Sequence, residues 1–506
     1  MGQIIFIDLG VIKRQAFQSS VLLYFGTLIG FLTTGLIAPN VLSKSEIGTL
    51  RLLLSYSAIF MSLSILGFST VTIRFLHQFQ DKITKKYNGF LGIALIVVTI
   101  GFLITWILIE VIEPSIVQNN IEKSPQFAKY FFLIIPLTIF QTYYALFDAY
   151  NNALYRSSYG VFLRDFVQRL LILSGLSLLF FKVFDFADYV YYYVLSICVP
   201  TVLILLHIIR HKSFDIKINT SFLRRTMLGS MMSVSLFGLL NSMSNIAALQ
   251  IDAIMINMYL DDAAVGVYVT TFYFGTLVFI PSKALNKIAP SLIARAFKED
   301  DQQTVKDIYY RSCANLFLIG ALVFLGLLVN LDNVFNIIPS TYEEGKLVVV
   351  LIGLANLVKM AGGSNDSLIT YSRYFKVTTL FLSVFAILII VLNYVFIPAF
   401  GIVGAAFATL LSIFVHNLTK YVFIRIKFGY NPYNYQYLFV LMISAGIYAI
   451  LFMIPDPENF ILDIFMDSAL AVVLFYVSVR KLRISGDLIE MARPMMAKAW
   501  HFFRKR

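Results

Sequence analysis

Charged residues are scarce in this sequence. Asp, Glu, Lys and Arg together make up 13% of its 506 residues, whereas apolar residues make up 59%. A soluble protein of this length needs far more polar surface, so water is not the main solvent of this chain. Cysteine is scarcer still. Cys198 and Cys313 both lie in apolar stretches, so neither a disulfide framework nor a thiolate metal site is supported.

Motifs for nucleotide and metal chemistry are also missing. No P-loop pattern for ATP occurs, and the five histidines are scattered and give no metal-ligand pattern. We therefore expect no cofactor and no bound metal. The formal charge of +12 does not indicate nucleic acid, because Lys and Arg recur between apolar runs instead of forming one patch.

Long apolar runs dominate the rest of the sequence. A helix needs roughly 20 apolar residues to cross a bilayer, and this template predicts an all-α membrane protein with fourteen transmembrane helices. The stretch after Lys13 and Arg14 shows no signal-peptide cleavage pattern, so we expect it to be the first of these helices. The expected ranges are 15–38, 50–73, 88–109, 130–153, 160–181, 187–209, 227–250, 263–282, 312–330, 347–370, 377–397, 401–419, 434–454 and 460–479.

Positive charge alternates between successive loops. Most of the 40 Lys and Arg lie in every second loop and at the two ends, and Lys420 is assigned to one of these loops, directly after the twelfth predicted helix. The opposite loops are mainly acidic. Because Lys and Arg are retained on the cytoplasmic side of short loops, both termini are expected in the cytoplasm.

A short pattern occurs twice, 218 residues apart. Leu42 and Gly48 follow the first predicted helix, and Leu260 and Gly266 follow the seventh. This repeat predicts two parallel six-helix lobes. The expected divisions are an N-terminal lobe over 15–209, a C-terminal lobe over 227–425, two further helices over 434–480, and a basic cytoplasmic tail over 481–506 that lies on anionic lipid.

Four segments in order along the chain carry a family resemblance. They are Leu42 to Gly48 with the later Leu66 to Phe68 and Arg74, Ile251 to Tyr268, Pro281 to Pro290, and Asn393 to Thr409. Their order and spacing resemble the oligosaccharide flippases, for O-antigen and other polysaccharides, of the multidrug, oligolipid and polysaccharide exporter superfamily.

The resemblance implies a transporter in the bacterial plasma (inner) membrane. It implies that an undecaprenyl-diphosphate-linked oligosaccharide is moved from the cytoplasmic to the outer leaflet by alternating access, for lipopolysaccharide O-antigen or other surface polysaccharide. Membrane lipid and a polysaccharide polymerase are then expected partners. Two alternatives stay open: a cation-coupled multidrug exporter of the same superfamily, and a flippase for the peptidoglycan precursor. No enzymatic activity is expected, because no outer loop is long enough to build a reaction site.

Charged groups inside the membrane are costly and are functional candidates by default. Asn356, Lys359 and Asp366 recur at helical spacing in the tenth predicted helix. This spacing predicts one stripe along a cavity, where Lys359 meets a diphosphate or a sugar acid. The alternative is an internal network of Lys359 with Asp366 or Asn356 that only ties helices together.

The seventh predicted helix carries a second polar stripe. Asn241, Asn245 and Asp252 lie four and seven residues apart and are expected to line a path for the head group. Asp252, like Asp366, is a candidate site for a coupling sodium ion or proton, and an interhelical hydrogen bond is the alternative for Asp252. Asp148, in the fourth predicted helix, is expected either to meet sugar hydroxyls or to cap a helix end.

Three further cations, Arg51, Arg74 and Lys283, lie near the ends of predicted helices. They are candidates for gates that attract the phosphates of the substrate, since Arg binds phosphate through two parallel hydrogen bonds. Anchoring at the membrane surface is the alternative for each of them. Arg74 is favoured, because it also belongs to a segment that carries the family resemblance.

Overall fold

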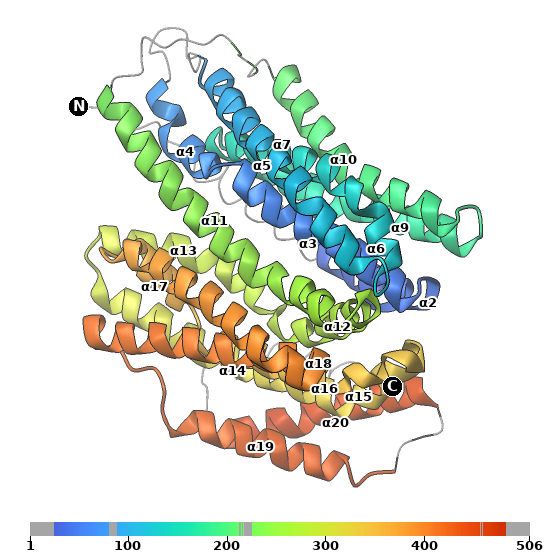
Figure 1. Cartoon of the computed structure of the whole chain (residues 1–506). Helices are drawn as coiled ribbons and strands as arrows, with labels where there is room; N and C mark the ends of the chain where they lie inside the picture. The colour runs from blue at the N-terminus through green and yellow to red at the C-terminus, as the bar shows by residue number, and fades with distance from the viewer. Residues whose placement is uncertain are drawn as a thin grey trace. The chain divides into compact units, whose positions relative to one another are not determined.

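The computed structural model describes residues 25–79, 89–211, 225–455 and 459–481 and the single positions 214, 216 and 457. Within these ranges all regular secondary structure is helical (Figure 1), which confirms the all-α prediction for this part of the chain. Most of the predicted tail 481–506 and the start of the first predicted helix lie outside the described residues.

The helices follow one another with short connections, and the label η marks π and 3₁₀ helices. The first half contains η1 (Phe31–Ile37), α2 (Ala38–Val41), α3 (Lys44–Ser64), α4 (Phe68–Phe75), η2 (Leu76–Phe79), α5 (Phe90–Asn120), α6 (Pro125–Tyr130), η3 (Phe131–Leu133), α7 (Ile134–Ala153), α8 (Ser157–Phe162), η4 (Leu163–Val167), α9 (Gln168–Phe180) and α10 (Phe186–Arg210). The second half contains α11 (Arg225–Tyr259), α12 (Asp262–Gly275), η6 (Thr276–Phe279), α13 (Ser282–Lys298), α14 (Gln302–Val329), α15 (Leu331–Ile337), η7 (Ser340–Gly345), α16 (Lys346–Ala361), α17 (Asn365–Tyr371), α18 (Phe375–Phe428), α19 (Tyr435–Leu451) and α20 (Phe460–Lys481).

Nine helices of the described residues are long and apolar enough to cross a membrane, and a bent pair, Ser340–Ala361 with Asn365–Tyr371, makes a tenth. Two shorter apolar helices also occur: Tyr435–Leu451 falls within the predicted span 434–454, and Phe25–Val41 overlaps the predicted span 15–38. The chain is therefore a membrane-type helical protein, and the count of fourteen spans and the cytoplasmic placement of both termini stay predictions. α13 is an addition, because it forms where the sequence analysis expected a cytoplasmic loop.

The longest helix, α18, contains a break. Its 54 residues would extend about 80 Å at 1.5 Å per residue, far more than the roughly 30 Å of a bilayer core. Gly401 has φ 58° and ψ −137°, which ends the first helix. A Cβ atom on Gly404 would overlap the carbonyl oxygen of Phe396, so the chain folds back here. The break lies where the sequence places the boundary between the predicted spans 377–397 and 401–419.

The repeated pattern of the sequence begins two helices in the same way. The Ser43 hydroxyl accepts a hydrogen bond from the backbone N–H of Glu46 at the start of α3, at 3.3 Å. Asp261, 218 positions later, accepts one from the backbone N–H of Ala264 at the start of α12, at 2.7 Å. Such side chains satisfy backbone donors that a helix start leaves free. Both copies of the pattern are therefore helix N-caps.

The two copies also contact each other. A Cβ atom on Gly48 would overlap the carbonyl oxygen of Asp262, and a Cβ atom on Gly266 would overlap the carbonyl oxygen of Lys44. The two contacts are related by the same offset of 218 residues, so each copy presents the same surface to the other, as in a twofold interface. Glycine is required at both positions because only its backbone fits at this separation.

Contacts between Cα atoms divide the chain into two compact units. Unit 1 comprises Met1–Thr270 and Leu382–Ala405, and unit 2 comprises Thr271–Phe381 and Ala406–Arg506. In unit 1, α11 runs alongside α3 and α4, and α7 packs against α3 and α10 (Figure 1). In unit 2, α14 packs against α16, α19 and α20. The predicted lobes 15–209 and 227–425 follow the sequence repeat rather than contacts, and they stay a prediction.

We expect the substitution Gly48→Ala to destabilise the protein by about 1–3 kcal/mol, because the added methyl group forces α3 away from α12. Gly446→Ala in α19 is the matched control, since nothing lies within 4 Å of a Cβ atom there. Thermal unfolding of the two purified variants in detergent tests this expectation. An unchanged melting temperature for Gly48→Ala would contradict the close contact.

Candidate functional site

The junction between α16 and α17 places two predicted site residues. The two helices bend by 46°, and Gly363 has φ +57°, a backbone conformation that favours glycine. Lys359 lies in the last turn of α16 and is exposed, with its Nζ 4.3 Å from the centroid of the Phe279 ring. Asp366 lies in the first turn of α17, and its side chain is 63% exposed.

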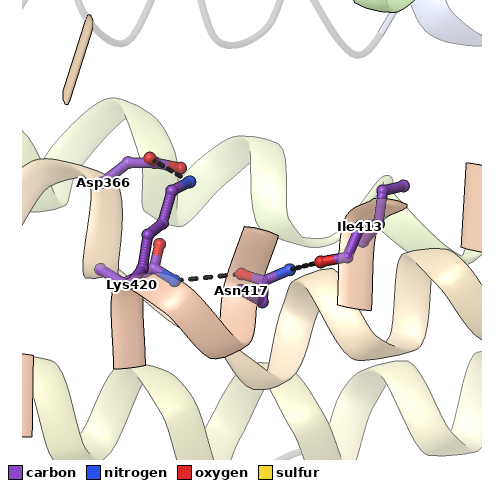
Figure 2. A network of polar contacts seen from close by, with 5 residues as sticks. Asp366, Ile413, Asn417 and Lys420 are labelled. Atoms are coloured by element: carbon purple, nitrogen blue, oxygen red, sulfur yellow. Dashed lines mark hydrogen bonds and ion pairs between the residues drawn. The ribbon is translucent and has the colours of Figure 1, made fainter. Parts of the chain in front are cut away.

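Asp366 forms an ion pair with a lysine of another helix. The Nζ of Lys420, in the second part of α18, donates to Oδ1 of Asp366 at 2.5 Å, and the Lys420 side chain is only 7% exposed. Figure 2 shows this pair beside Asn417, whose Nδ2 donates to the carbonyl oxygen of Ile413 at 3.2 Å. Asn365, the residue before Asp366, donates to Oδ1 of Asn417 at 3.1 Å. α17 and α18 are thus joined by an ion pair and an amide contact.

The charge of Lys359 interacts with both members of the Asp366–Lys420 ion pair. It interacts with Asp366, which attracts it, and with Lys420, which repels it. No hydrogen bond or ion pair to the Lys359 ammonium group occurs in the part of the chain that the structure describes. We call Lys359, Asp366 and Lys420 the two-lysine cluster.

Asn356, predicted on the same stripe, lies one turn before Lys359 on α16. Its side chain is buried, and Nδ2 donates to the carbonyl oxygens of Gly275, at 3.2 Å, and Ile352, at 2.9 Å. The first of these bonds ties α16 to the end of α12. Asn356 and Lys359 thus both contact the segment 275–279, Asn356 through a buried hydrogen bond and Lys359 through the Phe279 ring.

Lys420 is the residue that the sequence analysis missed, since it was assigned to a cytoplasmic loop. In the structure α18 continues to Phe428 and buries Lys420. The apolar residues Val422, Phe423 and Ile424, which follow Lys420, are the sequence signal that the helix does not end at residue 419.

The polar residues of α11, in unit 1, separate into two groups. Asn241 and Asn245 are exposed, whereas Asp252 is buried. Oδ2 of Asp252 accepts a hydrogen bond from the Tyr268 hydroxyl at 2.7 Å, and Oδ1 accepts one from Nδ2 of Asn393 at 2.6 Å. Asp252 therefore joins α11, α12 and the first part of α18. Neither of these two donors carries a formal charge.

Asn393 was also missed as a site residue, although it stands as a polar residue inside a predicted apolar span. Its amide oxygen is buried and has no hydrogen-bond partner among the described residues. Arg51, on α3, lies nearby: its Nη2 donates to the carbonyl oxygen of Leu249 at 3.1 Å, and it interacts electrostatically with Asp252. Arg51 thus binds the backbone of α11, and its positive charge attracts the carboxylate of Asp252.

The remaining predicted residues lie apart. Arg74 is exposed in the last turn of α4, and Lys283 is half-buried in the first turn of α13. Asp148 accepts a hydrogen bond from Nδ2 of Asn152 at 3.2 Å, and a Cβ atom on Gly160 would overlap its Oδ1. This packing of α7 on α8 favours the structural alternative for Asp148.

Lys123, which lies between two predicted spans, binds the C-terminal end of α11. The Nζ of Lys123 donates to the carbonyl oxygens of Asn257 and Met258, both at 2.8 Å. Burial lowers the pKa of Lys123, and the nearby Asp261 opposes this shift. A cation at this position suits the negative end of the helix dipole. Among the described residues, no group of three or more His, Cys, Asp or Glu side chains could hold a metal ion.

Comparison with known proteins shows the family of this chain. A family model described as polysaccharide biosynthesis protein matches residues 12–293, more than half of the chain. The chain belongs to the polysaccharide biosynthesis protein family. This membership confirms the resemblance stated from the sequence.

Two curated relatives of this family member come from Haloferax volcanii. The probable low-salt glycan biosynthesis flippase Agl15 is 24% identical over 211 residues, which are 40% of this chain and 44% of the relative. The probable flippase AglR is 28% identical over 196 residues, which are 36% of this chain and 39% of the relative. The matches thus span less than half the length of either relative.

Solved structures show which fold this polysaccharide biosynthesis protein has. The lipid II flippase MurJ, in an inward closed conformation, matches with a TM-score of 0.70 at 13% identity, covering 92% of this chain and 99% of MurJ. An inward-facing multidrug resistance MATE family transporter of the MOP superfamily matches with a TM-score of 0.62 at 12% identity, covering 82% and 98%. The fold is therefore that of these transporters.

We expect the substitution Asp252→Ala to lower stability by about 1–3 kcal/mol, because the buried side chains of Tyr268 and Asn393 lose their acceptor. Asn241→Ala on the same helix is the control, since Asn241 is exposed. Thermal unfolding without substrate measures both variants. Equal melting temperatures for the two variants would show that the Asp252 hydrogen bonds contribute nothing to stability.

Proposed function

We propose that this chain is a flippase that moves an undecaprenyl-diphosphate-linked oligosaccharide from the cytoplasmic to the outer leaflet of a bacterial plasma membrane by alternating access, for surface polysaccharide. Family membership and two flippase-named relatives support the class of activity. Both relatives are archaeal, so the undecaprenyl carrier, the bacterial membrane, the role in O-antigen assembly and a polymerase partner rest on the sequence resemblance.

The exposed charge of Lys359 carries this proposal. An ammonium group in contact with hydrocarbon is costly, and charged residues in membrane helices face protein or water instead. Lys359 is exposed in a membrane-type helix, and no carboxylate among the described residues forms an ion pair with it. We infer that Lys359 faces a water-filled chamber, where it attracts the phosphate groups of an anionic substrate.

A glycan also needs polar contacts along its path. Asn241 and Asn245 are exposed on α11, and amide groups donate and accept hydrogen bonds, as sugar hydroxyls require. Both residues therefore fit the predicted path for the head group. Arg74, exposed on α4, fits the predicted role of a cation that attracts phosphate at the entrance.

A cation-coupled multidrug exporter is the second candidate, because a MATE family transporter shares the fold. A site for a cationic drug would require exposed carboxylates without a lysine partner. Asp366 is paired with Lys420, and Lys359 adds a second positive charge beside it. The cluster therefore favours an anionic cargo. A peptidoglycan-precursor flippase remains a third candidate, and the choice of lipid substrate in the assay distinguishes it.

Asp252 is the better of the two predicted coupling sites. A carboxylate that already pairs with a lysine, as Asp366 does, has little free charge for a sodium ion or proton. Two hydrogen bonds to Asp252 come from the uncharged donors Tyr268 and Asn393, Arg51 interacts with it electrostatically, and the unpaired amide oxygen of Asn393 is a suitable further ligand. We therefore assign the coupling role to Asp252.

The proposed function is tested with proteoliposomes that contain a fluorescent lipid-diphosphate oligosaccharide. The wild-type protein should expose this lipid in the opposite leaflet, and Lys359→Ala should lower the rate about tenfold or more, since a charge-assisted hydrogen bond contributes about 1.5–3 kcal/mol. Lys346→Ala at the other end of α16 is the control, because Lys346 pairs with Asp332 at 3.0 Å. Transport of ethidium-like cations instead of the lipid would favour the exporter.

Coupling is tested in the same vesicles with an imposed sodium or proton gradient. We expect an ionophore that dissipates the driving gradient to slow flipping by the wild-type protein. Asp252→Asn, which keeps the side-chain shape and removes the charge, should flip slowly with or without the ionophore. A variant that stays as ionophore-sensitive as the wild type would remove Asp252 from coupling.

A further inference from the structure

The two partners of the Asp366–Lys420 ion pair differ in exposure. The Lys420 side chain is 7% exposed, whereas that of Asp366 is 63% exposed. A buried lysine needs a counter-charge, because an unpaired ammonium in an apolar environment is strongly unfavourable. An exposed carboxylate, by contrast, can be hydrated and can leave the pair at lower cost. Lys420 therefore depends on the pair more than Asp366 does.

The charge of the cluster is unbalanced. Lys359 and Lys420 supply two positive charges, and Asp366 supplies one negative charge. The further titratable group that acts on Asp366 is His416, one turn before Lys420 on α18, which adds no negative charge. One positive charge of the cluster thus has no carboxylate to neutralise it, so the cluster would attract an anion.

Side-chain contacts hold both helices of the ion pair in place. Asn417 is bound to the carbonyl oxygen of Ile413 within α18 and accepts from Asn365, which fixes the Lys420 side of the cluster (Figure 2). Asp366 lies on α17, a helix of seven residues that follows the bend at Gly363. α17 itself is held in place, since Asn365 donates to Asn417 and Leu368 and Ile369 are buried. The exchange therefore requires only that the exposed Asp366 side chain turns away from Lys420.

We propose that Asp366 is an exchangeable counter-ion: it occupies Lys420 in the empty transporter and is replaced by a phosphate group of the cargo, which then bridges Lys420 and Lys359. Phosphate and carboxylate oxygens accept the same ammonium hydrogen bonds. A diphosphate carries enough negative charge to neutralise both lysines, whereas Asp366 neutralises one. This inference rests on the proposed function and adds Lys420 as a binding residue and Asp366 as a residue that competes with the substrate.

The alternative is a purely structural ion pair that ties α17 to α18. The two readings differ for the substitution Asp366→Asn. If Asp366 competes with the substrate, its removal frees Lys420 and anions bind more tightly. If the pair is only structural, Asp366→Asn lowers the melting temperature and does not improve anion binding.

The experiment uses the full-length protein in detergent, with inorganic pyrophosphate as the probe and the shift in melting temperature as the readout. Asp366→Asn should bind pyrophosphate about tenfold more tightly than the wild type, a change of one decade in affinity. Lys420→Met should lose the shift. Asp332→Asn is the matched control, since it removes the carboxylate of the exposed Lys346–Asp332 pair and should leave the affinity unchanged.

The double variant Asp366→Asn with Lys420→Met separates stability from binding. Without charge at either position it should unfold near the wild-type temperature, bind no pyrophosphate and fail to flip the fluorescent lipid. Recovery of flipping by this double variant, or equal pyrophosphate affinity of Asp366→Asn and the wild type, would overturn the exchange. Flipping by the wild-type protein is measured in the same series, and its absence would refute the proposed function. If the wild type flips the lipid but Asp366→Asn does not bind pyrophosphate more tightly, only the exchange is refuted.

Discussion

A polar group inside hydrocarbon must find a partner or face water, and this constraint organises the structure. Asp252 is buried and receives two hydrogen bonds, from Tyr268 and Asn393. Lys420 is buried and pairs with Asp366. Lys359 has no such partner in the described residues and is exposed. Because lipid offers no hydrogen bonds, buried polar groups need partners within the protein, and an exposed charge without such a partner is expected to face water.

Close backbone packing is the second organising feature. Gly48 and Gly266 let α3 and α12 approach until each helix start meets the other, and Gly404 lets α18 fold back on Phe396. Small residues serve this purpose in membranes, where helices gain little from hydrophobic burial and depend on close contact instead. The sequence repeat therefore has a physical meaning. Its glycines are the positions where two equivalent segments touch.

The fold does not by itself select the cargo, because a lipid II flippase and a multidrug transporter both share it. The choice rests on the charges of particular side chains. Unit 1 contains the buried carboxylate of Asp252, and unit 2 contains Lys359 with the Asp366–Lys420 pair. A buried anion suits a coupling cation, and two lysines with one carboxylate suit an anionic cargo. Under the proposed function, the Asp252 site would serve energy coupling and the Lys359 site would serve substrate binding.

The sequence determined the membrane class, the approximate helix ranges, the boundary between the spans 377–397 and 401–419, and the candidate charges, because hydropathy and charge act over one or two helical turns. It could not determine which candidates belong together. Asp252 meets Asn393, 141 positions away, and Lys420 meets Asp366, 54 positions away. Such pairs depend on the rotation and depth of each helix, which packing between helices sets. Only the tertiary structure could therefore show that Asn356 is buried against Gly275, that Lys359 is exposed, and that Lys420 meets Asp366.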